Sequence, residues 1–111
     1  MKYLITKEEQ SLSGSTCYFE FQKGKFQDKH WLDTSLFIHV EIFDELELYK
    51  LFSFALEKFN YYGPTEIKKE QWSEISEFAK SKTQWKAFCE ELASWTEACF
   101  LEDQCFTICG I

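Results

Sequence analysis

Five cysteines and two histidines are among the residues of this sequence that could bind a metal ion. Cys105 and Cys109 lie four residues apart, and Cys99 precedes them by six residues. Structural zinc sites usually hold a loop between closely spaced cysteine pairs, but this pair stands in the alternating pattern of a strand. On a strand both thiols face one side with Thr107 between them, where cysteine packs as a small apolar residue. The spacing therefore favours packing over a metal site.

The same residues could act as a nucleophile or as a general base. His30 stands in DKHWLD and His39 in FIHVEI, while Cys89 and Cys99 fall within a helical pattern. None of them belongs to a recognised catalytic motif, and no P-loop, GxGxxG, GxSxG or HExxH is present. We therefore expect no catalytic residue, no metal and no cofactor. A small hydrolase that uses His30 or His39 remains an alternative.

Charge is the second possible source of function. The chain carries 12 basic and 19 acidic residues, a net charge of -7, and every basic residue is a lysine. Proteins that bind nucleic acid rely on arginine and on a positive surface, so both observations argue against a nucleic-acid ligand. An acidic domain suits a basic protein partner instead, because its field attracts that partner during encounter.

The negative charge begins in residues 31–60, where two lysines face six acids. Acids favour the first turn of a helix, which would explain Asp44 and Glu47 but leaves Glu41 and Glu45 without a structural reason. Phe54 lies off the apolar stripe of its helix, although a second packing layer would explain it equally well. We predict a partner-binding surface made of Glu41, Asp44, Glu45, Glu47, Phe54, Tyr61 and Tyr62.

The elements that must position these residues meet at Asp44. Apolar residues alternate from Leu36 to Ile42, which predicts a half-buried strand. Asp44 then fits a helix N-cap, and Glu47 fits the reciprocal position of a capping box. The helix predicted from there ends near Pro64, and its apolar stripe comprises Leu48, Leu51, Phe52, Ala55 and Phe59.

The flanking segments complete the predicted fold. Residues 15–22 alternate and predict a hairpin with an extended piece around Phe26, followed by a loop whose Trp31 tucks onto the sheet edge. Residues 68–80 predict a second helix, and Ser81 with Gln84 predicts the capping box of a third. Thr6 and Glu9 have the spacing for a brief helix that the pattern leaves open, and residues 104–111 predict a closing strand. We expect one α+β domain, residues 1–111, with a largely antiparallel sheet, three helices packed on one face and a C-terminal strand returning to the sheet.

Location is also suggested by the sequence. The segment MKYLITKEEQ lacks the apolar core of a secretory signal, and no run is long enough to cross a bilayer. We therefore expect a cytoplasmic protein without membrane contact, whose thiols are reduced.

At NYYGPTEIKKEQWSEI the chain resembles small bacterial immunity proteins, the cytosolic partners of polymorphic and contact-dependent growth inhibition toxins. The similar stretch runs from about Phe52 to Trp72, with a looser similarity at residues 92–95 and in FTICGI. The matching residues are structural and indicate no toxin contact: Tyr61, Tyr62, Gly63, Pro64 and Trp72. The resemblance implies a non-enzymatic protein that covers the active site of a cognate toxin, often a basic nuclease. A regulatory or adaptor domain that binds another protein is the first alternative.

Overall fold

The central strand of the fold is β2 (Tyr18–Lys23), whose alternating Phe19 and Phe21 face a helical layer. The computed structural model describes residues 1–111. Its sheet has five strands in the order β1-β3-β2-β5-β4, and all neighbours are antiparallel. The other strands are β1 (Ile5–Thr6), β3 (Leu36–His39), β4 (Pro64–Lys68) and β5 (Cys105–Cys109). The predicted α+β class and the returning C-terminal strand are confirmed.

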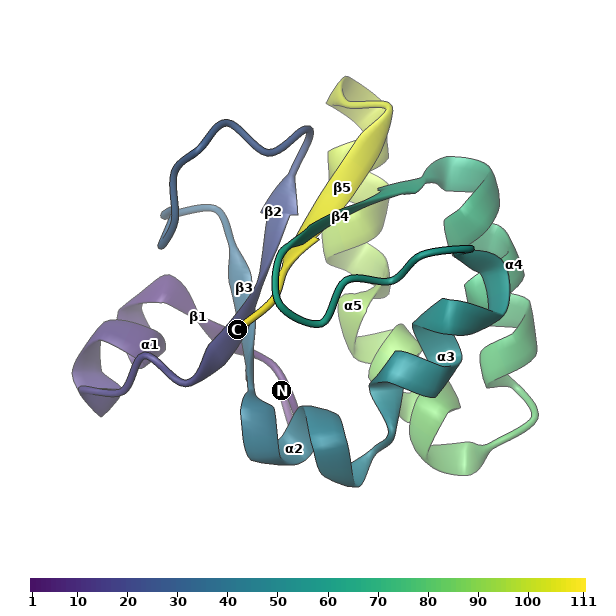
Figure 1. Ribbon diagram of the computed structural model, residues 1–111, viewed down its shortest axis with the longest axis horizontal. Coiled ribbons are helices and arrows are strands. Elements are labelled where there is room, and N and C mark those ends of the chain that lie inside the picture. Colours follow the sequence, from purple (N-terminus) through teal and green to yellow (C-terminus); the bar gives the residue numbers. More distant parts are fainter.

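Five helices accompany the sheet, where the sequence predicted three. They are α1 (Lys7–Ser13), α2 (Val40–Glu45), α3 (Leu48–Ala55), α4 (Lys69–Ala79) and α5 (Thr83–Glu102). Figure 1 shows α3, α4 and α5 together on one side of the sheet, and α1 on the other. None of these helices is long and apolar enough to cross a bilayer.

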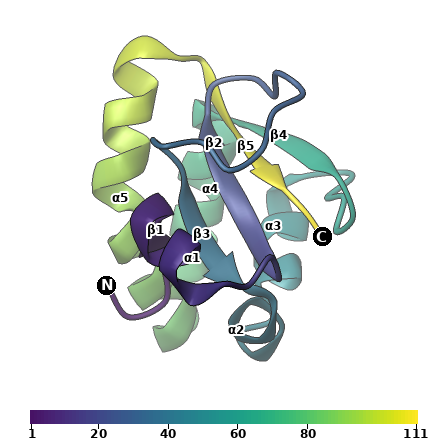
Figure 2. The ribbon, with the colours of Figure 1, turned by 90° about the vertical axis from the view of Figure 1, so that its left-hand side faces the viewer.

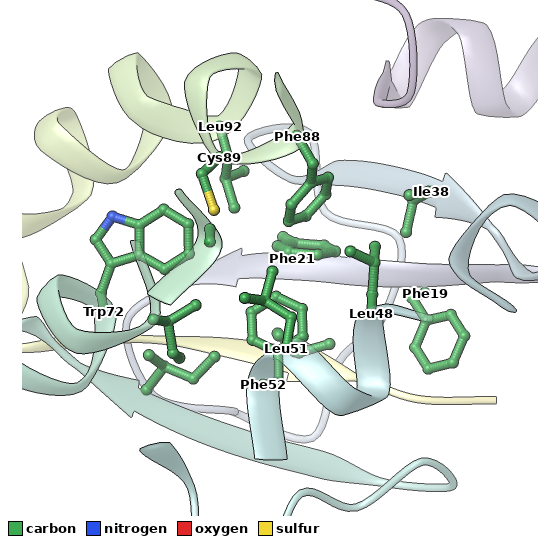
Figure 3. Packing of buried hydrophobic residues seen from close by; sticks show 14 of the residues in the cluster. Phe19, Phe21, Ile38, Leu48, Leu51, Phe52, Trp72, Phe88, Cys89 and Leu92 are labelled. Carbon is green, nitrogen blue, oxygen red and sulfur yellow. The ribbon is translucent and has the colours of Figure 1, made fainter. Parts of the chain in front are cut away.

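Aromatic rings fill the space between the sheet and the helices. Figure 3 shows Phe21 between Phe88 of α5 and Phe52 of α3, and the ring centroids lie 6.1 and 6.3 Å from that of Phe21. Phe21 also stacks on Phe106 of β5 at 6.4 Å. The edge of Trp72 of α4 meets Phe106 as well, at 5.5 Å. The alternation of the strands and the stripes of the helices therefore meet in one apolar core.

The opposite face of the sheet is covered by the long loop of residues 24–35, which Figure 2 shows crossing in front of the strands. The predicted hairpin with a strand around Phe26 is therefore wrong, because β2 pairs with β3 and β5 instead. Polar side chains of β2 hold the loop backbone, for example through the Gln22 amide, which donates to the Lys29 carbonyl at 2.7 Å. Trp31 stacks on Phe37 at 5.6 Å, on the face of the interior strand β3 and not at the sheet edge.

The junction predicted at Asp44 is also placed differently. Strand β3 ends at His39, opposite Tyr18, the first residue of β2. Because no partner strand continues past this pair, the chain turns at once into α2. His39 is the N-cap, and its Nδ1 accepts a hydrogen bond of 3.1 Å from the Glu41 amide. Asp44 is therefore inside α2 rather than at a helix start, and the long helix predicted from it is shortened to α3.

Among the remaining helices, only α5 begins differently from the prediction. Helices α4 and α5 form where their stripes indicate, but α5 begins after Lys82, without a side-chain cap. Ser81 instead donates its hydroxyl to the Phe78 carbonyl at 2.7 Å and closes the end of α4. The brief helix left open at Thr6 does form, with the reciprocal capping box between Thr6 and Glu9.

Candidate functional site

Helix α2 presents three exposed carboxylates, those of Glu41, Asp44 and Glu45. None of the three forms an ion pair with a lysine or histidine. Glu41 and Glu45 are one helical turn apart, a spacing at which two like charges repel. This helix therefore carries a concentrated, uncompensated negative charge.

Helix stability accounts for only one of these acids. The positive end of a helix dipole lies at its N-terminus, so acids stabilise the first turn and are unfavourable in the last. Glu41 belongs to the first turn of α2, so the expectation that the dipole does not explain Glu41 is wrong, while Asp44 and Glu45 are the last two residues of the helix. The dipole explanation offered for Asp44 from the sequence is therefore wrong, and its position at this end calls for another reason.

One such reason is a contact with Tyr61. The Tyr61 hydroxyl donates a hydrogen bond of 2.8 Å to Asp44 Oδ1. Its ring meets Phe19 edge-on at 5.1 Å and Phe43 at 6.0 Å, so the tyrosine spans from the core to the surface. Burial, with a further contribution from the Asp44 carboxylate, raises the pKa of Tyr61 to about 12. At neutral pH Tyr61 is thus a fixed, neutral donor to Asp44.

Tyr62, the next residue in the chain, is the most exposed aromatic residue of the protein. Its ring lies edge-on to Tyr61 at 5.0 Å, and 78% of the residue is accessible to solvent. Its amide donates to Asn60 Oδ1 at 3.0 Å, which fixes the turn that carries it. We define the acidic patch as Glu41, Asp44, Glu45, Tyr61 and Tyr62.

The segment after β5 holds this turn from the opposite side. The amide of Gly110 donates to the Gly63 carbonyl, and that of Ile111 donates to the Tyr61 carbonyl, both at 3.0 Å. A Cβ atom at position 110 would lie only 2.0 Å from the Tyr61 carbonyl oxygen. Glycine at this position therefore allows the two backbones to approach and keeps Tyr61 and Tyr62 in place.

The other two predicted binding residues lie outside the acidic patch. Glu47 forms ion pairs with Lys50 and with Lys82, the latter at 3.8 Å, and the hydrogen bond from Lys50 is the main reason its pKa is lowered. Phe54 stacks on Phe78 of α4, with ring centroids 3.9 Å apart. Phe54 is still 57% exposed, so the packing explanation accounts for only one side of its ring.

Most of the histidines and cysteines considered as catalytic residues make structural contacts or are buried. His39 caps α2, and the Cys99 thiol donates to the Cys105 carbonyl at 3.3 Å. Burial raises the pKa of the Cys89 thiol to about 12. The pKa of the Cys109 thiol is also raised to about 12, mainly by burial and secondarily by the negative charge of Glu20. Neither thiol is therefore poised as a thiolate nucleophile.

A hollow of about 660 Å³ lies on the surface between α4 and α5. Its lining includes Trp72, Glu77, Glu97 and Phe100 but no histidine or cysteine. It therefore contains neither His30 nor His39, the two residues on which the hydrolase alternative depends.

Sequence reasoning missed one buried acid, Glu20 of β2, which is only 3% exposed. It accepts hydrogen bonds from the Trp31 amide at 2.9 Å, the Leu32 amide at 2.8 Å and the Ser35 hydroxyl at 2.7 Å. The alternation correctly placed Glu20 on the face opposite Phe19 and Phe21. Nothing in the local pattern indicates that a loop covers that face.

In comparisons with family models, curated proteins and solved structures, nothing matches this chain.

Proposed function

We propose that this chain is a non-enzymatic binding protein that blocks a basic protein domain, in the manner of an immunity protein toward its cognate toxin. The observation that carries the proposal is the acidic patch, in which Glu41 and Glu45 have no cationic partner in the chain. Their helix is joined through Asp44 to Tyr61, whose ring contacts that of the exposed Tyr62. A basic partner would supply the missing countercharge.

The two kinds of side chain in the patch have different roles in binding. Carboxylates on a chain of net charge -7 attract a basic partner and orient it before contact. Tyrosine is enriched among the residues that dominate binding energy, because its ring buries apolar area while its hydroxyl keeps a polar contact. The proposed mechanism is steric: the bound chain covers the active site of the toxin, and it needs no chemistry of its own.

The test uses the C-terminal domain of the protein encoded directly upstream of this chain as the binding probe. Glu41→Lys with Glu45→Lys reverses two charges of the patch, and Glu70→Lys with Glu74→Lys makes the same change on exposed residues of α4. We expect the first pair to slow association by tenfold or more and the second pair to have a much smaller effect. Association of the unchanged chain should also slow steeply between low and physiological salt, since screening weakens steering.

Growth of cells that produce the toxin domain separates immunity from an adaptor role. An immunity protein restores growth, and the variant with reversed charges on α2 should lose this protection. An adaptor would bind without restoring growth. Equal loss of binding in the α4 variant would place the interface outside the acidic patch and contradict the proposal.

A further inference from the structure

Three side chains that differ in chemistry converge on the loop-covered face of the sheet. Glu20 and Cys109 are directly paired in the ladder between β2 and β5, and His30 comes from the loop of residues 24–35. One donor atom of each residue lies within 4.8 Å of the donor atoms of the other two. No local pattern in the sequence indicates this grouping, because 89 positions separate Glu20 from Cys109.

The carboxylate of Glu20 is held rigidly in this cluster. Oε1 accepts from the Trp31 amide, while Oε2 accepts from the Leu32 amide and the Ser35 hydroxyl. The nearest group that can carry positive charge is His30, whose Nδ1 lies 3.8 Å from Oε1, too far for a hydrogen bond. A buried carboxylate without a close cation is costly, and hydrogen bonds of this kind also orient carboxylates that ligate metals.

A cavity adjoins the three donor groups. It has a volume of about 240 Å³ and is lined by Glu20, His30 and Cys109 together with Tyr18, Trp31 and Ile111. Glu20 and Cys109 are both 3% exposed, whereas the side chain of His30 is 53% exposed. An ion entering from solvent would therefore meet the imidazole first and the two buried donors behind it.

We propose that Glu20, His30 and Cys109 bind one Zn²⁺ ion, with water as the fourth ligand. Thiolate, imidazole and carboxylate are the three ligand types that zinc takes in proteins, and sites with three protein ligands keep a position for water. Zinc bonds of about 2.0 to 2.3 Å place tetrahedral donor atoms roughly 3.5 Å apart. The exposed His30 closes the remaining distance by moving inward, and the thiol proton of Cys109 is released to solvent as the zinc–sulfur bond forms.

The bound ion would join β2, β5 and the covering loop at one point. It would supply the charge that the buried carboxylate lacks, and any ligand that binds only the folded state raises its stability. This site lies outside the acidic patch and does not depend on the function proposed for it. Of the three cysteines weighed as metal ligands from the sequence, Cys109 belongs to the cluster, whereas Cys99 and Cys105 do not.

The test is titration of the reduced, metal-free full chain with Co²⁺, whose bond to a thiolate gives a charge-transfer absorption band in the near ultraviolet. We expect the band to saturate at one Co²⁺ per chain and to be displaced by Zn²⁺. Cys109→Ser should abolish it, and His30→Ala should weaken Co²⁺ binding by tenfold or more. Cys17→Ser and His39→Ala are the matched controls and should keep the band.

His30 is exposed, so His30→Ala is expected to fold normally, and circular dichroism checks this. Absence of a band in the unchanged chain would overturn the proposal. So would a band that survives in Cys109→Ser or disappears in Cys17→Ser, since either result would place the metal elsewhere. Zn²⁺ should also raise the midpoint of thermal unfolding of the unchanged chain but not that of His30→Ala.

Discussion

The two faces of the sheet are both buried, but they are buried in different ways. On the helix-covered face, rings such as Phe21, Phe52 and Phe88 pack against one another with no exposed area. On the loop-covered face, Glu20, Gln22 and Thr107 are almost equally inaccessible, yet each is satisfied by a hydrogen bond to the loop or its ends. No buried side-chain polar atom of the protein lacks a hydrogen-bond partner.

Because of this difference, contacts on the helix-covered face should determine the stability of the whole fold, whereas contacts on the loop-covered face should determine the order of one loop. Apolar burial is not directional and is shared by many contacts, so the loss of one ring weakens the entire core. The hydrogen bonds that Glu20 accepts act at a few atoms, and their loss can release the loop while the helices remain folded. Three substitutions test this distinction.

The largest effect is expected on the helix-covered face. Phe52→Ala removes a ring that contacts Phe21, Phe43 and Phe88, and leaves a cavity in the core. The free energy of unfolding should fall by about 3 to 5 kcal/mol, measured by urea denaturation. Phe54→Ala, two residues later and exposed, should cost much less. Similar losses for the two variants would show that α3 does not anchor the core as described.

A smaller and more local effect is expected from Glu20→Ala. Two loop amides and the Ser35 hydroxyl lose their acceptor, which should cost about 1 to 3 kcal/mol. Hydrogen exchange should speed up at the Trp31 and Leu32 amides and stay slow within α5. Glu66→Ala, an exposed acid of β4, is the control. If α5 loses protection together with the loop, the two faces do not act separately.

The smallest effect is expected at the rim of the helix-covered face. Tyr61→Phe keeps the ring and removes the bond to Asp44, so at neutral pH the stability should change by less than about 1 kcal/mol. Because the pKa of folded Tyr61 is raised to about 12, above the ordinary value near 10, the folded state keeps its proton longer. The resulting stabilisation is complete below pH 10 and is lost as the pH rises toward 12.

Urea denaturation between pH 9 and 11 measures this loss. The unchanged chain should lose stability faster than Tyr61→Phe over that interval, and Tyr62→Phe should behave like the unchanged chain. Parallel curves for the unchanged chain and Tyr61→Phe would mean that neither burial nor the Asp44 contact raises the pKa of Tyr61 in the folded state.

The difference between the two faces of the sheet also explains which features could be predicted from the sequence. Alternation at Phe19, Phe21, Phe106 and Ile108 and the stripes of α4 and α5 depend on burial against regular elements, and they predicted the α+β fold. The Asp44 boundary failed because cap spacings occur by chance, and the real cap, His39, is set by the end of strand pairing.

The candidate site was predictable only in part. Five of the seven residues predicted to bind a partner do lie together, because Tyr61 and Asp44 are joined by a hydrogen bond. Glu47 and Phe54 are separated from them by contacts to Lys82 and Phe78, which no local pattern contains. The cluster of Glu20, His30 and Cys109 was hidden for the same reason, since pairing between distant strands creates it.

The position of β5 between β2 and β4 has a consequence for biosynthesis. Strand β4 borders only β5, so residues 64–68 have no neighbour in the sheet until residues 105–109 have left the ribosome. Pairing between Glu20 and Cys109 closes a loop of almost the entire chain, and such long-range contacts slow folding. A nascent chain that stops short of β5 would expose the edges of both neighbouring strands, and it is at this stage of synthesis that the protein depends most on protection from aggregation.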